Sequence, residues 1–110
     1  SSFGGRIILS QYAPGAGTLA AGDTISNSKQ CYKVTQTSNV TLTSTPTIAT
    51  SGATENQVLI IYNVGTHTLT LQDESSLSGS KIKSKTGSNI AIGPNAAAMF
   101  MFGGTYWIQL

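Results

Sequence analysis

Residues 96–110 read AAAMFMFGGTYWIQL, with an apolar side chain at every position from Met99 to Phe102. Successive side chains of a strand point to opposite faces, so a half-buried strand alternates apolar and polar residues. The run from Met99 to Phe102 leaves no polar face, and the two glycines that follow it favour a turn. We therefore predict a hairpin of two strands around Gly103 and Gly104, with both faces of its first strand covered.

The composition of the whole chain indicates a single all-β domain. Only 9% of its 110 residues are charged, against about 25% in an ordinary soluble domain. Serine, threonine and glycine are abundant, and these residues favour strands and turns. Apolar residues nowhere keep helical spacing over the length of a helix. A chain of this length has room for one domain.

Short apolar segments alternate with turn residues along most of the chain. The cleanest alternation is NVTLTS, where Val40 and Leu42 are separated by threonine, and QVLIIYN at residues 57–63 is a continuous apolar run typical of a central strand. Gly65 predicts a hairpin that joins this run to a return strand over residues 66–74. Such short strands, with turn signals about every 8–12 residues, predict an antiparallel β-sandwich with a jelly-roll-like arrangement.

The beginning of the chain differs from this pattern. An apolar segment, RIILSQY, lies between glycine-containing stretches, and APGAG ends it. We predict an extended N-terminal arm over residues 1–22, followed by the β-sandwich domain over residues 23–110.

Residues that carry catalysis or bind metal ions are few and scattered. His67 is the only histidine, and no nucleophile motif frames a serine. Asp73 and Glu74 are adjacent at a strand end, so their carboxylates point to opposite faces and form no catalytic pair. We predict that the chain is not an enzyme and has no catalytic residue, cofactor, metal ion or small-molecule substrate. A calcium ion in the loop near Asp73 stays an alternative, although the spacing matches no known calcium loop.

The charges and the apolar runs argue against nucleic acid and membranes as partners. A formal net charge of +2 is too small for nucleic-acid binding, and no apolar run is long enough to cross a bilayer. The start of the chain lacks the shape of a signal peptide, so we expect synthesis in the cytoplasm. Lys81, Lys83 and Lys85 share one strand face, which indicates a solvated face guarding a sheet edge, with contact to an acidic partner as the alternative.

From about Val40 to the end, the chain presents VTLTSTPTI, then QVLIIYNVGTHTLTLQDESSLSGSKI, then IAIGPNAAAMFMF, and a closing YWIQL. This order resembles the small β-sandwich modules of tailed-bacteriophage virions, which occur in capsid cement (decoration) proteins and in the tips of tail fibres. The resemblance rests on an apolar strand with an Asn-x-Gly turn, the L-x-L-Q-D-E turn, a Gly-Pro before an apolar strand, and a tryptophan near the C-terminus.

Modules of this kind commonly work as trimers, so the resemblance implies a homotrimer with the C-terminal hairpin near its axis. The residues expected at the subunit interface are Met99, Phe100, Met101, Phe102, Tyr106 and Trp107. The favoured role is a cement protein that binds the major capsid protein on the outer surface of the virion and stabilises the shell. The arm residues expected to contact the capsid are Phe3, Arg6, Ile7, Ile8 and Leu9.

The alternative role is a tail-fibre or spike tip that recognises a host receptor or glycan. Its binding residues would lie in two polar loops, TSGATEN at residues 50–56 and QDESSLSGS at residues 72–80. A fibre tip is normally the last module of a longer chain, whereas this chain starts at Ser1, and we therefore expect the cement role.

Overall fold

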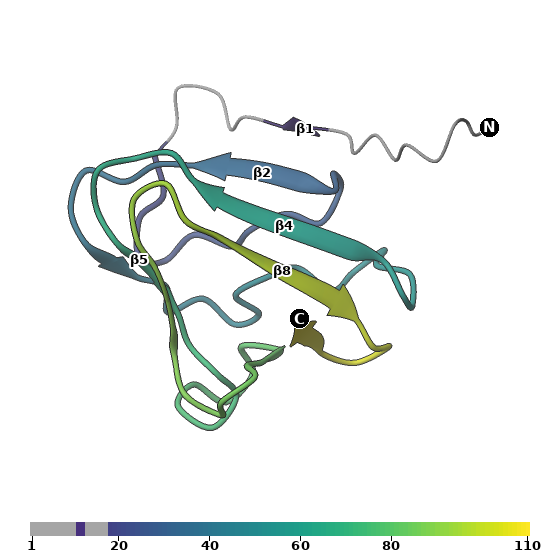
Figure 1. Cartoon of the computed structure of the whole chain (residues 1–110). Coiled ribbons are helices and arrows are strands. Elements are labelled where there is room, and N and C mark those ends of the chain that lie inside the picture. Colours follow the sequence, from purple (N-terminus) through teal and green to yellow (C-terminus); the bar gives the residue numbers. More distant parts are fainter. Residues whose placement is uncertain (1–10, 13–17) are drawn as a thin grey trace.

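The computed structural model describes the backbone of residues 11–12 and the whole of residues 18–110, which contain strands and no helix (Figure 1). The all-β prediction is confirmed for this part of the chain. The strands are β1 (Gln11–Tyr12), β2 (Cys31–Val34), β3 (Val40–Thr41), β4 (Val58–Asn63), β5 (Leu69–Leu71), β6 (Ile82–Lys83), β7 (Ile90–Ile92), β8 (Ala97–Phe102) and β9 (Trp107–Gln109).

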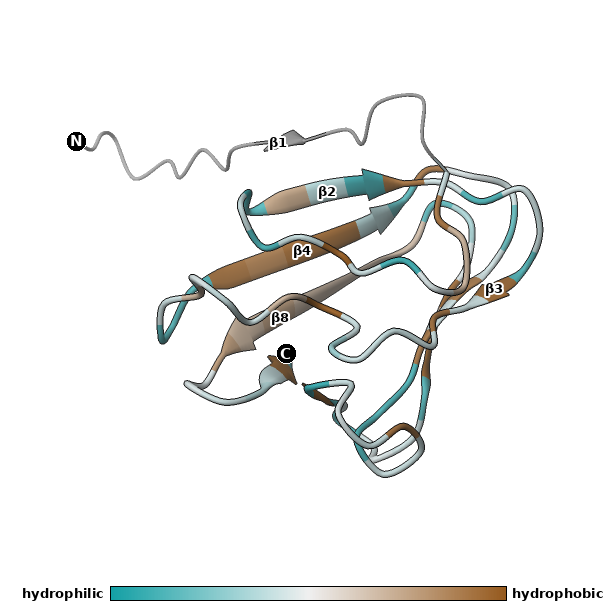
Figure 2. Ribbon diagram, turned by 180° about the vertical axis from the view of Figure 1, so that it is seen from behind, coloured by the Kyte–Doolittle hydropathy of each residue, from teal (hydrophilic) through white to brown (hydrophobic). Residues whose placement is uncertain are grey.

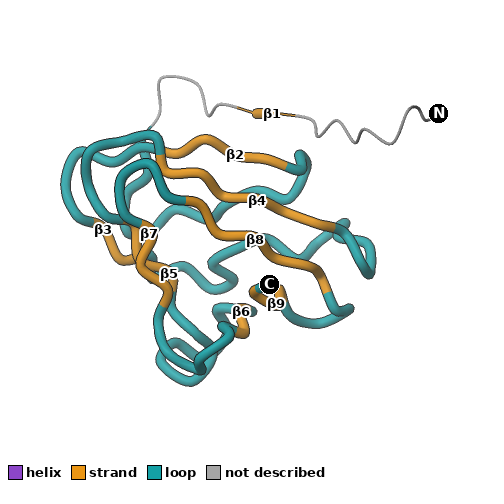
Figure 3. The backbone as a smooth tube through the Cα atoms, viewed as in Figure 1, coloured by secondary structure: helices purple, strands orange, loops and turns teal. Residues whose placement is uncertain are grey.

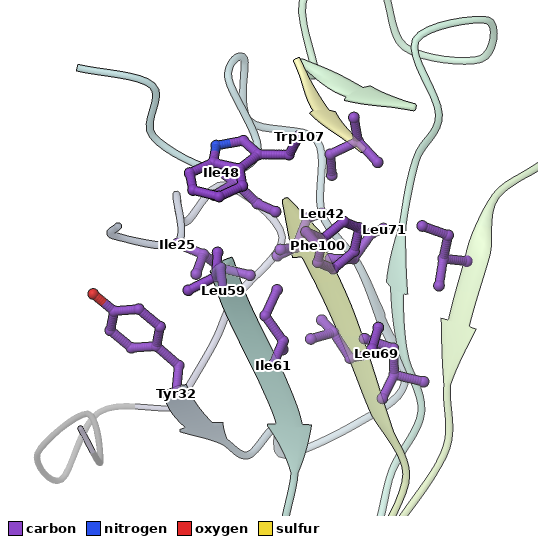
Figure 4. Packing of buried hydrophobic residues seen from close by; sticks show 14 of the residues in the cluster. Ile25, Tyr32, Leu42, Ile48, Leu59, Ile61, Leu69, Leu71, Phe100 and Trp107 are labelled. Atoms are coloured by element: carbon purple, nitrogen blue, oxygen red, sulfur yellow. The ribbon is translucent and has the colours of Figure 1, made fainter. Parts of the chain in front are cut away.

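The strands form two sheets that share one hydrophobic core. The large sheet has six strands in the order β1-β2-β4-β8-β9-β6, and the small sheet has three in the order β3-β5-β7. Figure 3 shows the small sheet beside one end of β2 and β4, and the arrows in Figure 1 mark it as their carboxyl end. The core, part of which is drawn in Figure 4, consists of Ile25, Tyr32, Val34, Leu42, Ile48, Leu59, Ile61, Leu69, Leu71, Ile82, Ile90, Ile92, Ala98, Phe100, Phe102 and Trp107.

Both sheets are mixed, which corrects the prediction of an antiparallel sandwich. The pairs β1–β2, β2–β4, β3–β5 and β6–β9 are parallel, whereas β4–β8, β5–β7 and β8–β9 are antiparallel. Parallel neighbours need a long crossover connection. Here the chain leaves β2, contributes β3 to the small sheet and returns as β4, so that β4 runs in the same direction as β2.

The predicted hairpin at Gly65 is also wrong, because β4 and β5 belong to different sheets. Asn63, which is fully buried, directs the chain between them. Its Nδ2 donates to the carbonyl oxygens of His67 at 2.7 Å and Ile92 at 2.8 Å. Its Oδ1 accepts the Gly65 amide at 3.0 Å. The turn that follows β4 therefore transfers the chain from the large sheet to β5, and His67 lies in this turn.

The predicted arm falls mainly on residues outside the described part of the chain. Its expected capsid contacts, Phe3, Arg6, Ile7, Ile8 and Leu9, all lie outside the described residues. Within residues 18–22, the Leu19 amide donates to the Thr35 carbonyl at 2.9 Å, and the Leu19 side chain packs at the edge of the core. The boundary between residues 22 and 23 stays a prediction.

Candidate interaction surface

The C-terminal hairpin forms as expected, and its two faces have different surroundings. Strands β8 and β9 pair antiparallel, with Phe102 opposite Trp107. On one face, Ala98, Phe100 and Phe102 are buried in the core. On the other face, Met99 is 43% exposed. The domain's own core thus covers one face of the apolar run, while the opposite face is open to solvent.

The residues predicted at the subunit interface divide between these two faces. Phe100 and Trp107 are fully buried, and the Trp107 ring centroid lies 5.0 Å from that of Phe102. Trp107 Nε1 donates to the Ala49 carbonyl at 3.1 Å. These side chains stabilise the fold, so an aspartate at Phe100 or Phe102 would unfold the domain whatever its assembly. The subunit interface itself stays a prediction.

The open side of the large sheet forms a continuous surface, which we call the outer sheet face. Side chains at alternate positions of β2, β4, β8, β9 and β6 point to this side, away from the core. In register across the strands, its rows are Val58–Met101–Ile108–Lys83, Cys31–Ile60–Met99 and Lys33–Tyr62–Ala97. Leu110, whose amide donates to the Met99 carbonyl at 2.9 Å, extends the middle row. Figure 2 shows the apolar character of β4 and β8.

The outer sheet face concentrates the exposed apolar side chains of the described residues. Among the described residues, the exposed large hydrophobic residues are Val64, Met99, Ile108 and Leu110. All but Val64 belong to the outer sheet face, and Val64 directly follows β4. Single exposed apolar residues are ordinary, whereas large contiguous apolar patches are typical of interaction sites.

The charged side chains that the described strands place on this surface are positive and lie at its sides. Lys33 lies on β2 and Lys83 on β6, at opposite corners of the rows that are described with side chains. The chain has four acidic residues, and none lies in a strand of the large sheet. They are Asp23, Glu55, Asp73 and Glu74. The outer sheet face is therefore apolar in the middle and cationic at its flanks.

An aromatic ring lies beside two lysines at the β6 side of the sheet. Lys83 Nζ lies 4.7 Å from the centroid of the Tyr106 ring, and Lys81 Nζ lies 5.4 Å from it. Tyr106 is partly exposed at the tip of the β8–β9 hairpin. The prediction that these lysines lie at a sheet edge is confirmed for Lys83, because β6 is the edge strand of the large sheet.

The carboxylates of the loop at residues 72–80 bind the loop's own backbone. Asp73 is almost fully buried, and its two oxygens accept the amides of Ser84 at 2.7 Å and Ser75 at 2.9 Å. Glu74 Oε2 accepts the amides of Lys81 at 2.7 Å and Gly79 at 3.1 Å. Burial raises the pKa of Asp73, but the hydrogen bonds from Ser84 and Ser75 outweigh it and lower this pKa from 3.8 to about 2. The pKa of Glu74 is also lowered, chiefly by the Lys81 amide.

These carboxylates make the domain less stable in acid. A carboxyl group with a lowered pKa in the folded state stabilises the fold above its unfolded pKa, and this contribution disappears as the pH falls through the folded value. For Asp73 the loss spans the range from its ordinary 3.8 to about 2. Asp73→Asn is expected to flatten the pH dependence of unfolding by urea in this range, compared with the unmodified chain. An identical pH dependence in both proteins would contradict this account.

His67, the only histidine of the sequence, lies in the turn that follows β4. His67 contributes its carbonyl oxygen to the Asn63 turn. Within residues 18–110, histidine, cysteine and acidic residues form no group of three that could hold a metal ion. Cys31 is a free thiol, partly buried on the outer sheet face. A membrane-spanning helix is likewise absent from the part of the chain that the structure describes.

Comparisons with protein families, with curated proteins and with solved structures find no match to this chain. The sequence predicted neither the extent of the outer sheet face nor its charge. Two segments of the sequence do indicate this face. Residues 58–62 and 99–102 carry apolar side chains at odd and even positions alike, and the two segments are neighbours in the large sheet.

Proposed function

We propose that this protein is a capsid cement protein of a tailed bacteriophage. It binds the outer surface of the capsid as a trimer, contacts the major capsid protein and stabilises the shell. The observation that carries the proposal is the outer sheet face, a contiguous apolar surface on a domain with little charge. An adhesive surface of this kind is what a protein needs to bury area against a neighbouring shell subunit.

Two features of the fold support a structural role. Both faces of β8 carry large apolar side chains, so the same strand stabilises the domain through Phe100 and offers Met99 to a partner. The two sheets share one core, in keeping with a small β-sandwich module. The jelly-roll-like arrangement and the trimer belong to the proposal.

A second role, recognition of a receptor or glycan by a fibre tip, has one observation in its favour. Tyr106 places a partly exposed ring beside Lys81, which directly follows the loop at residues 72–80. An aromatic ring and a cation are suited to an anionic sugar. The carboxylates of Asp73 and Glu74, however, accept backbone amides of their own loop, which leaves fewer of their lone pairs for a sugar hydroxyl.

Sedimentation with capsids of the phage that encodes the chain separates the two roles. For a cement protein we expect several hundred copies on each capsid, as a multiple of three at each lattice position. A few copies confined to the tail, together with binding to host cells, would contradict the cement role and support recognition. Tyr106→Ala is the variant that would then be expected to lose cell binding.

A further inference from the structure

We propose that the outer sheet face docks a partner protein whose contact patch is apolar in its centre and carries carboxylates at its sides. This inference deepens the proposed function, since it assigns a surface and a chemistry to the capsid contact. It also changes the role of Met99 and Met101, from contact between copies of this chain to contact with a different protein.

The two lysines of the outer sheet face lie far apart. Lys33 and Lys83 lie on strands that are separated by β4, β8 and β9. The two lysines belong to different rows, at opposite corners of the face. With strands about 4.8 Å apart, they lie about 19 Å apart across the strands alone. This separation exceeds the screening length of about 8 Å at physiological ionic strength, so each lysine needs an anionic partner of its own. A fitting partner therefore presents carboxylates on both sides of an apolar centre.

The charges of the outer sheet face disfavour packing against the same face of a second copy of the chain. The strands of the large sheet that are described with side chains contribute lysines and no carboxylate. Two outer sheet faces packed together would place lysines of these strands in a desolvated contact, without a side-chain carboxylate from the same strands. Like charges placed against each other in an interface cost affinity and serve to reject a wrong partner. Any contact between copies in the proposed trimer then involves other surfaces.

The side chain of Lys83, at the β6 flank, lies against an aromatic ring. Lys83 Nζ lies 4.7 Å from the Tyr106 ring centroid, and Lys83 pairs in register with Ile108. The cation–π contact therefore favours a position of the cation next to the apolar row before any partner binds. Restricting a long side chain in advance lowers the entropy lost on association. The charge is consequently presented together with the apolar surface, as a docking contact requires.

The test compares two variants that change the net charge equally. Lys33→Glu with Lys83→Glu alters the outer sheet face, whereas Lys29→Glu with Thr37→Glu and Ser38→Glu alters exposed residues outside the strands. The first probe is carboxylate-modified polystyrene beads, which are apolar with acidic groups, compared with amine-modified beads. The second probe is capsids of the encoding phage stripped of this protein. Oligomer mass is measured for each protein by sedimentation equilibrium.

We expect the face variant to lose binding to carboxylated beads and to capsids by about tenfold, and the control variant to stay within about twofold of the unmodified chain. Added salt should weaken capsid binding, and oligomer mass should be the same in all three proteins. Equal losses in both variants, or a changed oligomer mass in the face variant alone, would overturn the inference. If the beads distinguish the variants as expected but no protein binds capsids, the docking surface stands and the proposed function fails.

Discussion

Replacing Phe100 by alanine is expected to lower the free energy of unfolding by about 4 kcal/mol. Phe100 is fully buried in the core between the two sheets, as Figure 4 shows. Its truncation removes apolar surface from the core and leaves a cavity that the paired strands on both sides of β8 cannot fill by moving. Unfolding by urea, followed by the fluorescence of Trp107, the only tryptophan, measures the change.

The neighbouring residue on the same strand provides the control. Met99 is 43% exposed on the outer sheet face, so Met99→Ala is expected to cost less than about 1 kcal/mol. The large difference between adjacent positions follows from the alternation of side chains along β8. Similar losses of stability in the two variants would show that the faces of β8 are assigned incorrectly.

Asn63→Leu is expected to lower the free energy of unfolding by about 3 kcal/mol, although leucine is apolar and similar in size. Asn63 satisfies the carbonyl oxygens of His67 and Ile92 and the amide of Gly65. Leucine leaves these groups without their partner at the junction of the two sheets, and unpaired buried polar groups are costly. Urea unfolding measures this loss as well.

An exposed asparagine serves as the comparison for this variant. Asn39 Oδ1 accepts a single hydrogen bond, from the Thr68 amide at 2.9 Å, and water can replace it. Asn39→Leu is therefore expected to cost less than about 1 kcal/mol. If Asn63→Leu were as mild as Asn39→Leu, the Asn63 hydrogen bonds would not be what joins β4 to the small sheet.

Some of the fold follows from local sequence patterns. The all-β class, the central apolar strand Val58–Asn63 and the hairpin of β8 and β9 were all indicated by residue alternation and turn residues. These features depend on interactions between near neighbours in the chain. The sequence therefore contains their signals within a few residues.

Strand direction and sheet membership depend on distant contacts. Val58–Asn63 and the next strand look like a hairpin because Gly65 lies between them, but the buried Asn63 side chain bonds to Ile92, far along the chain. Likewise, β2 and β4 are parallel because β3 lies in the other sheet. Nothing in the spacing of apolar residues encodes such crossovers.

Local sequence patterns indicated only the β8 part of the candidate surface, because the rest depends on contacts between strands. The apolar residues of both parities in MFMF indicated a covered outer face, and Met99 and Met101 do lie there. The pattern could not separate Phe100 and Phe102, which fill the core, from contact residues. Val58, Ile60 and Ile108 join the surface only through the pairing of β4, β8 and β9.

The oxidation of methionine tests the role of the outer sheet face most directly, because the chain has two methionines and both lie there. Hydrogen peroxide oxidises methionine according to its exposure, and mass spectrometry measures the rate. We predict rapid oxidation of Met99 in the free protein, whatever its oligomeric state, and oxidation of both methionines at least about fivefold slower on the capsid. Equal rates in the free and capsid-bound protein, or protection already present in the free oligomer, would contradict the assignment of this face to the capsid.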